Sequence, residues 1–161
     1  MRDNIKEYDN GDKEWYSNGK LHREDGPAIE RANGSKLWYS NGKLHREDGP
    51  AIEDANGTKE WWITGEHHRE DGPAIVLYNE AGTKEWYLNG ELHREDGPAR
   101  ERANGTKEWY LNGKCHREDG PARERANGTK VWCLNGKSLT EDEFKTRIEF
   151  VEFKSRLNKG K

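Results

Sequence analysis

The sequence has few cysteines and no long apolar run. Its two cysteines, Cys115 and Cys133, are too few for a disulfide-built fold, and we expect both to be free thiols in a reducing compartment. No stretch approaches the roughly 20 apolar residues of a membrane span, and the opening "MRDNIKEYDN" lacks the apolar core of a signal peptide. We therefore expect a cytoplasmic protein.

The sequence also lacks the short motifs that carry common chemistries. It has no P-loop, no GxGxxG, no GxSxG, no CxxC pair and no HExxH. Its formal net charge of -3 favours neither a nucleic-acid nor a membrane partner. These absences predict a protein that is not an enzyme and holds no cofactor and no metal.

Hydrophobic residues are scarce as well, at 30% against 37% charged. A balance this polar is close to that of chains that bury too little apolar surface to fold. Seven tryptophans, six tyrosines and a regular period argue against disorder. A chain in which each unit contacts only its neighbours tolerates such a composition better than a compact globule does.

The period is 23 residues, with a third unit of 25. Aligned on tryptophan, six units start at Gly11, Gly34, Gly57, Gly82, Gly105 and Gly128. Each has the form G-x-K-x-W-Y-x-N-G-x-x-H-R-E-D-G-P-A-x-x-x-x-N, with two Asn-Gly turn signals in most units. The repeat therefore predicts antiparallel hairpins.

Cross-strand charge predicts the register of the two turns. A two-residue loop at Asn18-Gly19 places Tyr16 opposite Leu21 and also sets Glu14 against Arg23. At the second turn, a three-residue loop of Ala103-Asn104-Gly105 pairs Arg100 with Glu108 and Glu101 with Lys107. A two-residue loop there would set like charges opposite each other.

The tetrapeptide His-Arg-Glu-Asp has the residue types of a metal site or a proton relay. It stands at 22–25, 45–48, 68–71, 93–96 and 116–119. One histidine per unit, spaced along a sheet, does not give converging metal ligands. We expect a scaffold role: histidine beside tryptophan, arginine and glutamate in cross-strand pairs, and Asp-Gly-Pro turning the chain through the dihedral freedom of glycine.

The C-terminal segment departs from the repeat. Thr140 and Glu143 form a capping box, and a helix from about 141 to 157 is expected. Phe144, Ile148 and Val151 share one face, which we expect to cover the last sheet edge. Phe150, Phe153 and Leu157 share the other face, which either remains exposed for a partner or a second copy of the chain, or is also buried against the repeats.

Other departures from the consensus are candidate sites. In the third unit, Trp61, Trp62, His67 and Tyr78 either form a partner-binding cluster or, for Trp62 and His67, one more stacked cross-strand pair. The insertion of that unit lies around Tyr78-Asn79-Glu80. An alternative site is a basic strand surface for an anionic nucleotide, made by Arg100, Arg102, Arg123 and Arg125.

The W-Y-x-N-G-x-x-H-R-x-D-G-P-A unit, over residues 11–137, resembles the MORN-type hairpin repeats, and is most similar to their bacterial and phage-encoded variants, including antitoxin-like ones. The usual glycine spacing of that family is not kept, and His-Arg-Glu-Asp-Gly-Pro is peculiar to the variant. The resemblance implies a binding scaffold, and for a phage protein an inhibitor of a host defence or toxin protein in the host cytoplasm. A fold shared with that family does not by itself define an activity.

Together these observations predict an all-β protein. We expect an elongated, twisted antiparallel meander of about six hairpin repeats with a C-terminal capping α-helix. The expected division is a cap strand at 1–10, the array at 11–137, and the helix and tail at 138–161. The expected partner is another protein, with a homo-oligomer through the helix as a further possibility and neither nucleic acid nor membrane expected.

Overall fold

The structure is a computed structural model, and it describes residues 3–78 and 82–159; within the helix, the side chains of 152, 153 and 155–159 lie outside this description. Asn79 and Glu80 of the expected insertion lie outside it too. The chain divides into two compact units, 1–91 and 92–161, each of which is described separately.

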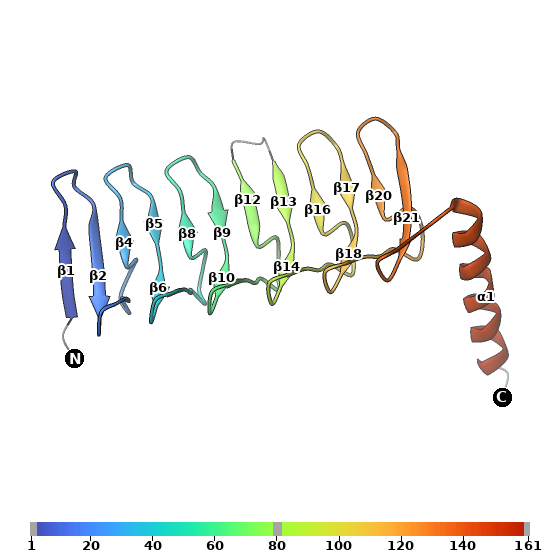
Figure 1. The fold of residues 1–161 in the computed structure, drawn as a ribbon, viewed down its shortest axis with the longest axis horizontal. Coiled ribbons are helices and arrows are strands. Elements are labelled where there is room, and N and C mark those ends of the chain that lie inside the picture. The colour runs from blue at the N-terminus through green and yellow to red at the C-terminus, as the bar shows by residue number, and fades with distance from the viewer. Residues whose placement is uncertain (1–2, 79–81, 160–161) are drawn as a thin grey trace. The chain divides into compact units, whose positions relative to one another are not determined.

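The regular elements in the described part of unit 1 are all short strands, joined by turns and loops (Figure 1). They are β1 (Asp3–Glu7), β2 (Lys13–Ser17), β3 (Lys20–Leu21), β4 (Ile29–Glu30), β5 (Lys36–Leu37), β6 (Tyr39–Ser40), β7 (Lys43–Leu44), β8 (Ile52–Glu53), β9 (Lys59–Glu60), β10 (Trp62–Ile63), β11 (Glu66–His67), β12 (Ile75–Leu77), β13 (Thr83–Glu85) and β14 (Tyr87–Leu88). A further strand, β15 (Glu91–Leu92), spans the division between the units.

Unit 2 repeats the same pattern and ends in a helix. Its elements are β16 (Arg100–Glu101), β17 (Lys107–Glu108), β18 (Tyr110–Leu111), β19 (Lys114–Cys115), β20 (Arg123–Glu124), β21 (Lys130–Leu134), β22 (Lys137–Leu139) and α1 (Glu141–Lys159). The prediction of an all-β meander of hairpin repeats followed by one C-terminal helix is therefore confirmed.

Within unit 1, the main sheet runs β1-β2-β4-β5-β8-β9-β12-β13, and every pairing is antiparallel. Each repeat contributes two neighbouring strands to this sheet. The remaining strands form a second, smaller hairpin in each repeat, such as β6 with β7 and β10 with β11. Unit 2 follows the same scheme, with β16, β17, β20, β21 and β22 in order.

Both predicted turn registers are confirmed. Tyr16 lies opposite Leu21 across the two-residue loop. Asn18 and Gly19 there have φ values of 50° and 76°, the left-handed pair that a tight type I′ hairpin turn needs. At the second turn Arg100 lies opposite Glu108, and the amide of Gly105 donates to Arg102 O at 2.9 Å, which closes the three-residue loop.

The predicted pairing of Glu14 with Arg23 is wrong. The small hairpin ends at His22, whose amide donates to Trp15 O at 3.0 Å. Beyond that point β2 exchanges its partner: Glu14 lies opposite Ile29 of β4, and Lys13 lies opposite Glu30. The strand β4, which follows later in the same repeat, thus occupies the position opposite Glu14 where Arg23 was predicted.

The core is built from small residues repeated at one position per unit. One alanine per repeat is fully buried: Ala28, Ala51, Ala74, Ala99 and Ala122. A serine or threonine at the second turn is buried as well: Ser35, Thr58, Thr83 and Thr106. The turn hydroxyls join successive repeats, because Ser35 Oγ accepts from Ala55 N at 3.0 Å and Thr106 Oγ1 from Ala126 N at 3.2 Å. Close backbone approach and repeated hydrogen bonds replace a large apolar core.

The predicted capping box begins α1. Thr140 N donates to Glu143 Oε2 at 2.9 Å, and Glu143 N donates to Thr140 Oγ1 at 3.2 Å. Phe144 is 4% exposed and packs on Trp132, with ring centroids 4.8 Å apart. Ile148 is half-buried, but Val151 is 60% exposed, so the expectation that it also covers the sheet is wrong. Among the helix side chains that the structure describes, those of Phe144 and Ile148 are covered and those of Phe150 and Val151 are exposed.

Candidate functional site

The arginine of each His-Arg-Glu-Asp loop holds that loop together. In the second repeat, Arg46 lies over its own Trp38, with the guanidinium carbon 4.0 Å from the ring centroid. Its Nε donates to Asp48 at 2.8 Å and its Nη1 donates to Pro50 O and to Glu53, both at 3.1 Å. The same stacking joins Arg23 to Trp15, Arg69 to Trp61 and Arg117 to Trp109 at 3.9–4.2 Å.

The glycine of each Asp-Gly-Pro turn has a steric role. None of the five, Gly26, Gly49, Gly72, Gly97 and Gly120, has a positive φ, so the predicted use of its dihedral freedom is wrong. A Cβ built on Gly49 would instead lie 3.0 Å from the guanidinium carbon of Arg46. Glycine therefore lets arginine pack directly against the turn backbone, and a Cβ at this position would force the guanidinium to shift.

Each histidine joins one repeat to the next. Nδ1 of His45 accepts the backbone N–H of Thr64 at 3.1 Å, in the first turn of the following unit. In the other four loops, histidine Nδ1 accepts the backbone N–H of an asparagine at 3.0–3.2 Å. The pairs are His22 with Asn41, His68 with Asn89, His93 with Asn112 and His116 with Asn135. Nδ1 of each of these five rings is thus occupied by a contact with the next repeat. In the part of the chain that the structure describes, no group of three or more potential ligands could hold a metal ion.

The two acids of each loop reach into solvent. The Asp48 side chain is 83% exposed and that of Glu47 is 84% exposed. The Arg46 guanidinium beside Asp48 holds the pKa of that carboxyl below its ordinary value. Glu47 lies 3.7 Å from Nε2 of His45, beyond a good hydrogen bond. The predicted cross-strand pairing of this glutamate is therefore wrong, because the strand has ended before it.

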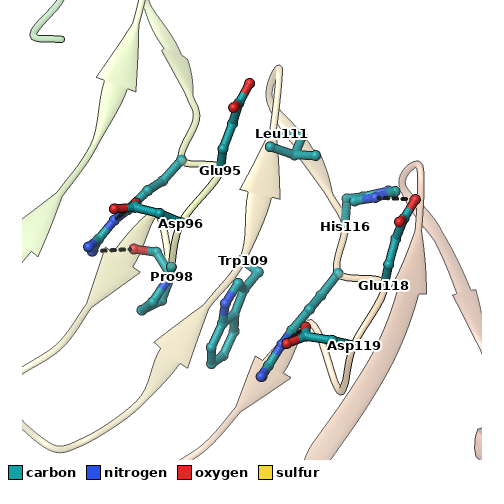
Figure 2. A pocket seen from close by; sticks show the side chains of 11 residues that line it. Glu95, Asp96, Pro98, Trp109, Leu111, His116, Glu118 and Asp119 are labelled. Carbon is teal, nitrogen blue, oxygen red and sulfur yellow. Dashed lines mark hydrogen bonds and ion pairs between the residues drawn. The ribbon is translucent and has the colours of Figure 1, made fainter.

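A cleft lies between the loops of successive repeats. In unit 2 its volume is about 660 Å³, and Figure 2 shows Trp109 between the loop that ends at Pro98 and the loop of His116, Glu118 and Asp119. Leu111, Glu95 and Asp96 complete the labelled lining. In unit 1, clefts of about 620 and 640 Å³ repeat this lining around Trp38 and Trp61. Trp61 was predicted as a partner-binding residue, but the other residues of these clefts were predicted as scaffold alone; the signal for the cleft was the constant spacing between Trp and His-Arg-Glu-Asp-Gly-Pro.

Of the predicted partner-binding residues in the third repeat, Trp61 lines such a cleft and Trp62 lies elsewhere. Trp62 stacks on His67 with ring centroids 3.6 Å apart, and both donate to Glu60, at 3.0 and 2.9 Å. These donors hold the pKa of Glu60 below its ordinary value although burial opposes the shift. Trp62 and His67 are therefore a packed cross-strand pair, as the second of the two sequence-based alternatives had it.

The remaining aromatic candidates are exposed where they are described. Tyr78 is 70% exposed, and Phe150 is 56% exposed with the Lys154 ammonium 4.5 Å from its ring centroid. The side chains of Phe153 and Leu157 lie outside the described residues. Tyr78 is not among the residues that line the cleft around Trp61.

Two of the four arginines proposed for an anion have intramolecular partners. Arg100 donates to Glu108 at 3.1 Å, and Arg123 donates to Tyr110 Oη at 2.8 Å. Arg102 and Arg125 are exposed. A nucleotide on this surface would have to compete with the first two contacts.

Cys115 and Cys133 are free and buried beside Ala122. Burial raises the pKa of the Cys115 thiol to about 12. A protonated, enclosed thiol such as that of Cys115 is a poor nucleophile and a poor metal ligand, and both cysteines pack in the core.

Comparison with known proteins gives no relative for this chain: no family model matches it, and no curated protein matches it. The described helix is not both long and apolar enough to traverse a bilayer. What the chain does is therefore inferred from its own geometry.

Proposed function

We propose that the chain is a non-enzymatic scaffold that binds another protein through the clefts between its repeats. The observation that carries this proposal is the recurrence of one cleft, with the same residue types and nearly the same volume, in unit 1 and again in unit 2. A protein partner with several contact points gains affinity from such repetition by multivalency.

The loops are better suited to this role than to catalysis. The arginine of each loop donates hydrogen bonds within the loop, and the histidine accepts one from the next repeat. The exposed loop groups are carboxylates, which repel phosphate, and this weighs against nucleic acid at the clefts. The basic surface of Arg100, Arg102, Arg123 and Arg125 is left as the alternative for an anionic nucleotide.

The sequence resemblance supports the same class of function. MORN-like repeats are mostly binding scaffolds, and a phage-encoded member would act by covering a surface of a host defence or toxin protein, or as an antitoxin. The partner would then be met in the host cytoplasm.

Capture from a bacterial lysate tests the proposal. We would compare the parent protein with a cleft variant, E47K/E70K, and with a matched variant of two exposed glutamates away from the clefts, E66K/E91K. The cleft variant should recover its partner at least tenfold less well, and the matched variant should recover it normally. Failure to capture any protein would overturn the proposal, and so would equal recovery by both variants.

A nucleotide panel tests the alternative. A nucleotide that raises the melting temperature of the parent protein, but not that of an R102Q/R125Q variant, would favour anion binding over a protein partner.

A further inference from the structure

The clefts of unit 1 have an apolar floor. The tryptophan ring is covered on one side by arginine, and it lines the cleft together with proline from the preceding repeat and an aliphatic or aromatic neighbour. In the cleft between the second and third repeats these residues are Pro50, Trp61 and Ile63. Such a floor favours an apolar segment or the aliphatic stem of a long side chain.

The walls of each cleft are acidic. The cleft around Trp61 holds four carboxylates, Glu47, Asp48, Glu70 and Asp71, and only two arginines, Arg46 and Arg69. Each arginine Nε is already bound to the aspartate of its own loop at 2.8 Å. Glu47 and Glu70, 84% and 83% exposed, are left to attract a cation from outside. A long side chain with a terminal positive charge satisfies both the floor and the walls.

The spacing of the clefts selects the backbone that could present such side chains. Each repeat adds two strands to the sheet of unit 1, so neighbouring clefts are separated by roughly 9.5 Å. A polyproline II segment repeats every three residues, or about 9.3 Å, and every third side chain points the same way. A β-strand presents same-side residues every 6.5–7 Å or so, which does not match.

Three successive clefts lie in unit 1. Beside the clefts around Trp38 and Trp61, a third lies between β1 and the first repeat, lined by Asn4, Ile5, Trp15 and the loop of Arg23. A segment of seven residues or more would span all three, with one contact in each.

We propose that these clefts form a track for an extended, basic segment of a partner protein, with lysine or arginine at every third residue. In the clefts around Trp38 and Trp61 the aliphatic stem of the cation lies along Trp and Pro, and its charge lies between the glutamates of successive loops. In the cleft around Trp15 the stem lies along Trp15 and Ile5, and the charge lies beside Glu24. This inference rests on the proposed scaffold function and names the chemistry of the partner.

Synthetic peptides test the track directly. The probe is a labelled peptide of four Lys-Pro-Pro triplets, which favours polyproline II. The first comparison peptide has the same composition but an irregular spacing: its four lysines alternate with prolines, and the remaining prolines follow as one run. The second comparison peptide has glutamate in place of each lysine. Binding to the full chain is followed by fluorescence anisotropy at low and moderate salt.

The regular lysine peptide should bind at least tenfold more tightly than the irregular one, and the glutamate peptide should not bind. E47Q/E70Q should weaken binding about tenfold, while E66Q/E91Q should change it less than twofold. Glutamine keeps the size of the side chain, and an unchanged melting temperature shows that the fold is kept.

Equal affinity for the two lysine peptides overturns the spacing, and undiminished binding by E47Q/E70Q overturns the site. If no peptide binds but a captured protein is still lost from the E47K/E70K variant, the basic track is wrong and the scaffold function stands. If neither binds, both proposals fail.

Discussion

At the scale of single residues, the arginine of each loop connects sequence to structure most directly. Its planar guanidinium can stack on an indole and still donate in plane to a carboxylate and a carbonyl. Arg46 does all of this with Trp38, Asp48 and Pro50. A lysine ammonium is a point charge that cannot stack and bridge in this way.

Arg46→Lys should therefore lower the free energy of unfolding by about 1–2 kcal/mol, because a stacked guanidinium and its hydrogen bonds are lost. Urea unfolding followed by tryptophan fluorescence measures it. The reverse exchange in the same repeat, Lys43→Arg, lies at an exposed position and should change stability by less than about 0.5 kcal/mol. Equal effects of the two exchanges would contradict the stacking role of Arg46.

The two thiols should be nearly inert in the folded chain. Cys133 is only 3% exposed, which shields it from a reagent, and burial raises the pKa of Cys115 to about 12, so very little of the Cys115 thiolate exists at neutral pH. An aromatic disulfide reagent should react with them about a hundredfold more slowly in buffer than in urea. A cysteine placed at the exposed Glu91 is the control and should react at similar rates in both. Fast reaction of the parent protein would show that the thiols are open.

At the scale of elements, the sequence predicts those structures that depend on interactions between residues close together in the chain. The Asn-Gly turns and the Thr140 capping box depend on a few adjacent residues, and both are where the pattern places them. The pairing of Glu14 was wrong because β4, more than ten residues further on, takes the place opposite it. The clefts were missed for the same reason, since each joins two repeats.

The helix shows the same division between local and distant effects. Its start was predicted from Thr140 and Glu143, whereas its contacts were predicted only in part: Phe144 is buried and Val151 is not. The sequence pattern defines the helix faces, but how much of each face is covered depends on the angle at which the helix leaves β22. No local pattern contains that angle.

Thr140→Ala should shorten or fray α1, because the N-cap hydroxyl accepts the amide of Glu143. Loss of an N-cap of this kind costs about 1 kcal/mol. The helical signal in circular dichroism should fall, and the strand signal should stay. Thr146→Ala is the matched control: its hydroxyl donates to Asp142 O within the helix, and alanine has the higher helix propensity, so helicity should hold or rise. A drop in both variants would contradict the cap.

At the scale of the whole molecule, repetition multiplies small effects. A single exposed ion pair contributes little to stability. Here the same arginine–aspartate pair occurs in five loops, and in each the arginine lowers the pKa of the aspartate; the aspartates are Asp25, Asp48, Asp71, Asp96 and Asp119. Five shifts of the same direction act on one unfolding equilibrium.

These shifts predict how stability depends on pH. Because each aspartate binds its proton more weakly in the folded chain than in the unfolded chain, protonation favours unfolding. The stabilisation is complete above the ordinary pKa of 3.8 and is lost as the pH falls through the lowered folded value. The contribution of these aspartates to stability should therefore be constant from about pH 7 to pH 5 and should fall below about pH 4.

Thermal unfolding in a series of buffers measures this dependence, with a D48N/D71N variant as the comparison. Asparagine keeps the shape but cannot ionise, so the variant should melt at a lower temperature than the parent at pH 7 and lose less on acidification. The melting temperatures of the two proteins should converge once the pH falls below the lowered folded pKa of the aspartates, where the parent's aspartates are protonated too. If the variant loses as much stability in acid as the parent, the loops do not cause the acid sensitivity, and the remaining carboxylates, such as Glu60 held by Trp62 and His67, would have to cause it.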